Sequence, residues 1–207
     1  MWGDPAGLLV VAVALVVAAT VHEYAHAYVA DRRGDPTPRR QGRLTLNPLA
    51  HLDPVGSLLI LVAGFGWARP VPVTPALLSR PRRDLMLVAA AGPLANLTVL
   101  FALGAPYKLG VLEAAPWADA LSLQRVLAVS LRVNAMLATF NLMPIPPLDG
   151  SRILEGLLPP RMVPAYARLR PYGTWVLLAL VFSRALSATL VPPMRWLTVQ
   201  ATGSALF

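Results

Sequence analysis

The chain has 207 residues, of which 56% are hydrophobic, and a formal net charge of +8. So apolar a composition excludes both an ordinary soluble domain and a disordered chain. The positive charge does not favour nucleic-acid binding, because the arginines cluster at the ends of apolar segments, as they do beside membrane spans. The chain has no cysteine, which excludes disulfides and thiolate metal ligands.

Residues 8–29 form the first predicted transmembrane helix. Residues 1–5 contain no basic residue, and the apolar stretch is too long for a cleaved signal peptide, so we expect the helix to be retained. Only Asp4 precedes it, whereas a cluster of arginines follows it: Arg32, Arg33, Arg39, Arg40 and Arg43. The C-terminal end of this helix should therefore face the cytoplasm.

The first helix carries the motif His22-Glu23-Tyr24-Ala25-His26 near its end. H-E-x-x-H on a helix places two imidazoles on one face, close enough to bind one zinc ion, and the glutamate can act as general base on water. Ionisable groups at membrane depth are costly unless they are paired, bound to a metal or functional. The alternative is that these are ordinary structural residues whose hydrogen-bonding groups are satisfied by neighbouring helices. The motif favours a zinc peptidase that works within the membrane.

A zinc site needs at least one more protein ligand. The only other histidine is His51, so the remaining ligand is His51 or a carboxylate.

The apolar run of residues 54–66 is too short to cross a bilayer as a helix. Arginines follow it at positions 69, 80, 82 and 83, so both of its flanks resemble cytoplasmic loops. We expect this segment to dip into the membrane and return, or to lie as strands and loop against the protein. His51 and Trp67 should then lie on the same side.

Three further spans are predicted along the chain. Residues 85–105 cross outward, residues 121–142 return to a proline-rich turn at residues 144–147, and residues 171–190 cross outward again. The tail, residues 191–207, fits either an interfacial segment or a partial span. The predicted fold is an all-α polytopic membrane protein of about four to six transmembrane helices, with a short re-entrant or β-like segment between the first two main spans. Residues 1–207 form one domain.

This topology suggests Asp149 as the third ligand. His22 and His26 lie a few residues before the cytoplasmic end of the first helix, and Asp149 follows the returning helix at its cytoplasmic end. The three side chains therefore share one depth, although an aspartate before a glycine is also common in ordinary turns.

Four separated stretches carry a family likeness: HEYAH at residues 22–26, AGPLAN at 91–96, NLMP at 141–144 and LDG at 148–150. With these motifs, the chain resembles the site-two protease family of intramembrane zinc metalloproteases. Residues 47–56 and 66–73 resemble its short bacterial and archaeal branch. The likeness covers about residues 8–190. The chain begins at the catalytic helix, and we expect no PDZ or CBS module.

The resemblance implies that His22, His26 and Asp149 bind one zinc ion and that Glu23 is the general base. It also implies that Asn141 helps to shape the site.

The oxyanion of the reaction needs a hydrogen-bond donor, and either Asn141 or His51 is a candidate. Asn141 can equally bridge helix backbones, and His51 can equally hold its loop.

The expected protein is thus a multi-pass enzyme of a prokaryotic cell membrane, with its active site towards the cytoplasm. Its partners are membrane-protein substrates and the lipid bilayer, with no nucleic acid, and homo-oligomerisation is left open. A membrane zinc transporter or metal-binding protein is the alternative function, but it gives no reason for a glutamate directly after His22. A third alternative is an inactive relative with a scaffold role.

Overall fold

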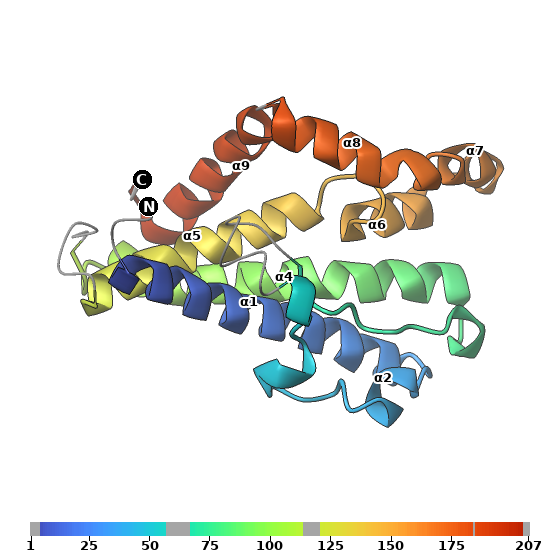
Figure 1. Cartoon of the computed structure of the whole chain (residues 1–207), viewed down its shortest axis with the longest axis horizontal. Coiled ribbons are helices and arrows are strands. Elements are labelled where there is room, and N and C mark those ends of the chain that lie inside the picture. Colours follow the sequence, from blue (N-terminus) through green and yellow to red (C-terminus); the bar gives the residue numbers. More distant parts are fainter. Residues whose placement is uncertain (1–4, 57–66, 114–120, 184, 205–207) are drawn as a thin grey trace.

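The computed structural model describes residues 5–56, 67–113, 121–183 and 185–204, and these are helical apart from their connecting loops (Figure 1). The α-helices are α1 (Pro5–Arg32), α2 (Thr37–Arg40), α4 (Pro81–Lys108), α5 (Leu123–Asn141), α6 (Asp149–Leu157), α7 (Val163–Ala167), α8 (Arg170–Phe182) and α9 (Ala185–Thr202). Short 3-10 turns lie at η1 (Pro48–Ala50), η2 (Pro75–Leu77) and η3 (Pro160–Met162). The predicted all-α class is confirmed.

Helix α4 is the centre of the fold and packs against α1, α5, α6 and α9. Its contact with α5 and α9 buries a cluster of Leu100, Leu131 and Ala135. Between α1 and α5 the buried residues are small, with Ala14 and Ala18 facing Val133. Small side chains let helix backbones approach closely, which is how helices associate within a bilayer.

Helices α1 and α4 are each long and apolar enough to cross a membrane. Helix α1 also exposes a stripe of Leu9, Val13 and Val17, each more than half accessible, as a lipid-facing surface would. The pair α8 and α9 passes the same test only as one span bent by 84°. The described residues therefore contain two candidate spans, or three with the bent pair, and the expected four to six remain a prediction.

Helices α1 and α4 run antiparallel, because the end of α1 lies beside the start of α4. The Ser79 backbone N–H donates to the Arg33 carbonyl oxygen over 3.2 Å, and the Arg33 side chain lies 3.9 Å from the buried carboxylate of Asp84. The described connection between the two helices therefore begins and ends at the same end of this helix pair.

The two ends of the segment predicted to dip into the membrane meet in space. The Arg69 N–H donates to the His51 carbonyl oxygen over 2.8 Å, and Leu52 and Ala68 form an isolated antiparallel bridge. The chain at His51 accordingly lies close to the chain just after Trp67, and the expected position of both residues on one side of the membrane stays a prediction. Residues 57–66, which make up most of the predicted segment, lie outside the described residues.

The proline-rich turn after α5 places Asp149 at the first residue of α6. Helix α5 ends at Asn141, and the prolines that follow cannot continue it. Gly150 lets the turn fold back tightly, since a Cβ there would lie 2.2 Å from the Leu142 carbonyl oxygen. Helix α6 packs on α4, so the turn brings Asp149 towards α1.

The C-terminal part differs from the expected single span over residues 171–190. Helix α8 ends at Phe182, and a separate helix α9 begins at Ala185, in the region where Ser183 and Arg184 interrupt the apolar run. The tail continues α9 and packs on α4 and α5 through buried Thr198 and Ala201.

Candidate metal centre

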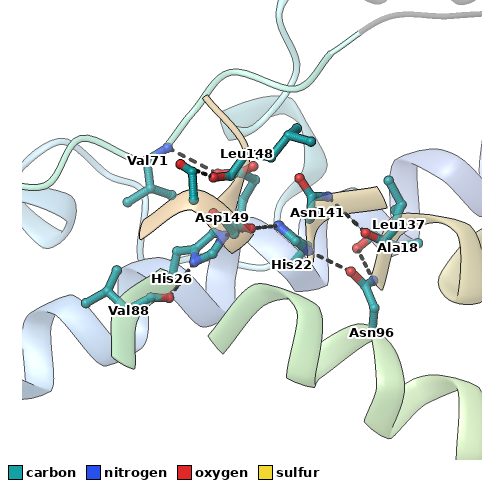
Figure 2. Close-up of polar contacts among 12 residues, drawn as sticks. Ala18, His22, His26, Val71, Val88, Asn96, Leu137, Asn141, Leu148 and Asp149 are labelled. Carbon is teal, nitrogen blue, oxygen red and sulfur yellow. Dashed lines mark hydrogen bonds and ion pairs between the residues drawn. The ribbon is translucent and has the colours of Figure 1, made fainter. Parts of the chain in front are cut away.

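His22, Glu23 and His26 lie on α1, and the two histidines lie on the face turned towards α4 and α6 (Figure 2). The two imidazoles are one helical turn apart and only 5% and 8% exposed. Their ring centroids lie 4.6 Å apart. The helix therefore presents both histidines to one buried volume, as the spacing of the motif predicts.

Both imidazoles are held through their Nδ1 atoms. The Nδ1 of His26 lies 2.7 Å from the carbonyl oxygen of Val88, which can only accept a hydrogen bond, so this nitrogen carries the proton. The Nδ1 of His22 lies 2.6 Å from the side-chain oxygen of Asn96 and donates to it. In the neutral rings, each Nε2 is then left with a lone pair.

The two Nε2 atoms converge on the carboxylate of Asp149. Its Oδ2 lies 3.0 Å from Nε2 of His22 and 3.2 Å from Nε2 of His26. Three acceptors so placed repel one another unless a cation lies between them. Tetrahedral zinc with N and O ligands separates neighbouring ligand atoms by about 3.3 Å, so this donor set fits zinc.

Gly92 of α4 borders this cluster. A Cβ at position 92 would lie 2.5 Å from the Nε2 atoms of both His22 and His26. A glycine in a helix interior is unfavourable by roughly 0.5–1 kcal/mol relative to alanine. Here its missing side chain leaves the space in which the ligand atoms meet.

The Glu23 side chain contacts a different part of the chain from the two histidines. Its Oε2 accepts a hydrogen bond of 3.1 Å from the backbone N–H of Val71. Val71 belongs to an extended segment, residues 67–74, in which Pro70 and Pro72 have no N–H. The segment is tied down further by Asp35, a fully buried carboxylate that accepts the Thr74 N–H over 2.6 Å.

A buried positive charge lies near Glu23. The Arg43 guanidinium is 3% exposed and donates to the carbonyl oxygen of Arg69. Burial lowers the pKa of Arg43, and the negative charge of Glu23 only partly offsets this. Because guanidinium starts from so high a pKa, Arg43 still carries its charge at neutral pH.

A cavity of about 640 Å³ opens beside the cluster. His22, Glu23, His26 and Asp149 all line it. Its remaining wall is mainly apolar and comes from four places in the chain: Leu15 and Ala19; Trp67, Ala68, Pro70, Val71, Val73 and Pro75; Leu85, Val88 and Ala89; and Leu137, Phe140, Asn141, Pro147, Leu148 and Arg152. The cavity thus joins the three acceptor atoms and Glu23 to a largely apolar space.

The two proposed oxyanion donors differ in position. Asn141 lines the cavity, and its Nδ2 donates to the Leu137 carbonyl oxygen one turn earlier over 3.0 Å. The His51 side chain is not among the residues that line the cavity; its Nε2 bonds the Thr45 carbonyl oxygen over 2.8 Å. This geometry favours the interpretation in which His51 holds its loop.

Sequence reasoning gave no individual role to Asn96, Asn134, Gly92 or Val71. For Asn96 and Asn134 a signal was present, because an amide inside an apolar helix must find a partner. For Gly92 the signal was a glycine in a helix interior. Val71 acts through its backbone, which no side-chain pattern reveals.

The chain is similar to known proteins over most of its length. The model of the family described as "Peptidase family M50" matches residues 104–183, which include Asn141 and Asp149. A protein of Bacillus subtilis, provisionally named zinc metalloprotease YwhC, is 44% identical over 188 residues, or 88% of this chain and 84% of YwhC. A protein of Mycobacterium tuberculosis, provisionally named zinc metalloprotease Rip2, is 32% identical over 201 residues, or 93% of this chain and 74% of Rip2.

No solved structure matches the chain. The match to YwhC extends over most of both proteins. The chain therefore belongs to peptidase family M50, the site-two protease family of zinc metalloproteases.

Proposed function

We propose that the chain is an intramembrane zinc endopeptidase that hydrolyses peptide bonds in or near the transmembrane segments of other proteins. The convergence of three acceptor atoms from His22, His26 and Asp149, with Glu23 on the same cavity, carries this proposal. A protein that only binds a metal needs the side chains of His22, His26 and Asp149 but not that of Glu23. A carboxylate placed beside them supplies the base that hydrolysis also needs.

His22, His26 and Asp149 hold the zinc ion. When bound, zinc supplies a Lewis acid that polarises the scissile carbonyl and activates a water molecule. Glu23 takes a proton from a water molecule as the water oxygen bonds to the scissile carbonyl carbon, and it delivers this proton to the leaving amine as the C–N bond breaks. The Val71 N–H orients the Glu23 carboxylate for both transfers.

Asn141 is the better of the two candidates for steadying the oxyanion. Its side chain already lines the cavity, and turning from Leu137 would give the amide a substrate carbonyl to bind. His51 would have to leave the Thr45 carbonyl oxygen first.

The substrate reaches the site as an extended strand. A helical segment hides its carbonyl groups in i to i−4 hydrogen bonds, so it must unwind before attack. The cavity suits such a strand, because apolar side chains at Leu15, Ala19 and Phe140 continue from the histidines along α1 and α5.

The site faces the cytoplasm of a prokaryotic cell, and the chain crosses the membrane four to six times, with residues 54–66 re-entrant. Arginines gathered where α1 ends and α4 begins support this orientation. Single cysteines at exposed Gln41 and Ser79 test it with an impermeant thiol reagent. Both should react only from the cytoplasmic side, and labelling from opposite sides would overturn the topology.

Glu23→Gln tests the peptidase against a zinc transporter. The variant keeps the size of the side chain but not its basicity, so zinc content should stay unchanged while cleavage of a single-span substrate falls by roughly 10²- to 10⁴-fold. Glu113→Gln, the same change at an exposed residue, is the control and should cleave normally. Zinc transport into vesicles without any cleavage by the unaltered protein would refute the peptidase.

A further inference from the structure

Two asparagines are buried in the helices behind the metal centre. Asn96 of α4 is fully buried and Asn134 of α5 is 3% exposed. Their amides form a chain of hydrogen bonds across three helices, which ends at His22 of α1. Figure 2 shows the last link, between Asn96 and His22. Polar side chains in this position are costly unless every donor and acceptor is satisfied.

The chain of hydrogen bonds fixes which way the Asn96 amide points. Its Nδ2 donates to the Ala18 carbonyl oxygen over 3.1 Å and to the Asn134 side-chain oxygen over 2.9 Å. Asn134 in turn donates from its own Nδ2 to the Ser130 carbonyl oxygen over 2.9 Å. A flipped Asn96 amide would set its oxygen against two other acceptors.

The side-chain oxygen of Asn96 must therefore face His22. It lies 2.6 Å from Nδ1, so His22 has to carry its proton on Nδ1 to make this contact. The lone pair is then on Nε2, which is the atom directed at Asp149. His26 needs no such side-chain partner, because the backbone carbonyl oxygen of Val88 fixes its tautomer.

We propose that Asn96, oriented by Asn134, is a positioning residue that holds His22 in the tautomer and ring orientation required for binding zinc. This inference rests on the proposed zinc site. Outer-shell partners of histidine ligands typically contribute 10- to 100-fold to metal affinity. The two asparagines thereby link the position of α5 to the geometry of the metal centre on α1.

Zinc affinity of the purified, detergent-solubilised protein tests the proposal by competition with a chelator. Asn96→Leu keeps the volume of the side chain but removes the acceptor, and zinc should bind roughly 10- to 100-fold more weakly. Asn96→Asp keeps an acceptor for the His22 Nδ1–H and should recover most of the affinity, even though it loses both donated hydrogen bonds. Asn134→Leu should weaken zinc binding by a smaller factor.

Leu100→Ala is the matched control. Leu100 is fully buried one turn further along α4 and belongs to the core with α5 and α9. This variant should lower the thermal stability of the metal-free protein without changing its zinc affinity. If Leu100→Ala weakens zinc binding as much as Asn96→Leu does, or if Asn96→Asp is no better than Asn96→Leu, the asparagine acts only through packing and the proposal fails.

The same experiment separates this inference from the proposed function. If the unaltered protein binds no zinc, the proposed function fails. If it binds zinc, and Asn96→Leu binds zinc equally well, only the positioning role is overturned.

Discussion

The two halves of the metal centre are built differently. The histidines are held from behind by buried groups of one long helix, namely Val88 and Asn96 of α4. Glu23 is held from the front by one backbone N–H, that of Val71, in an extended loop segment. The ligand half of the proposed site is thus part of the packed core, whereas its proposed base half depends on a loop.

This difference fits the separate demands of binding and catalysis. Metal ligands must keep one geometry, so rigid helices and buried amides suit them. A general base must exchange protons with water and let a substrate approach, so a single hydrogen bond from the cavity wall suits it. Changes behind the histidines should therefore alter zinc binding, and changes in the loop should alter cleavage while zinc stays bound.

The largest effect is expected for the ligand that joins the two halves. Asp149→Ala removes the only carboxylate that contacts both histidines among the described residues, and leaves two ligands of three. Zinc affinity should fall by more than the roughly 10- to 100-fold expected for an outer-shell partner. His51→Ala should retain zinc, because the His51 ring bonds the Thr45 carbonyl oxygen. Metal analysis of both variants checks this, and the reverse pattern would assign the third ligand to His51.

A smaller loss of zinc is expected for Gly92→Ala. The new methyl group would lie 2.5 Å from both Nε2 atoms, and α4 would have to shift to relieve the contact. Overpacking of this kind typically costs about 1–3 kcal/mol, so we expect roughly a tenfold or greater loss of zinc affinity. Alanine favours a helix, so the metal-free protein should remain folded. Zinc titration followed by thermal unfolding measures both quantities, and unchanged affinity would show that the space at Gly92 is not needed.

A change in the loop that contacts Glu23 should slow cleavage and leave zinc binding unchanged. Val71→Pro removes the N–H that Glu23 accepts, in a segment whose neighbouring residues are already prolines. A hydrogen bond to a charged group is worth about 1.5–3 kcal/mol, so cleavage should slow by about tenfold or more, with zinc content unchanged. Val71→Ala keeps the N–H and should cleave nearly normally. Equal losses in the two variants would assign the effect to the valine side chain instead.

The sequence predicted the helices and the members of the cluster better than it predicted how they are held. His22 and His26 follow from spacing within one helix, and Asp149 from the depth of the turn after α5. The hydrogen bonds to Val88 and Val71 use backbone atoms, which any residue provides. Helix α9 packs against α4 and α5, and an apolar run of residues does not reveal such packing or where the run is divided into two helices.

The prolines in the segment beside Glu23 have a consequence for aggregation between protein molecules. An extended segment with free N–H groups is a template on which other chains can add as strands and aggregate. Pro70, Pro72 and Pro75 have no N–H to offer. The N–H groups of Arg69, Val71 and Thr74 are bound within the protein, to the His51 carbonyl oxygen, Glu23 and Asp35. This wall of the cavity therefore discourages unselective strand pairing between neighbouring molecules.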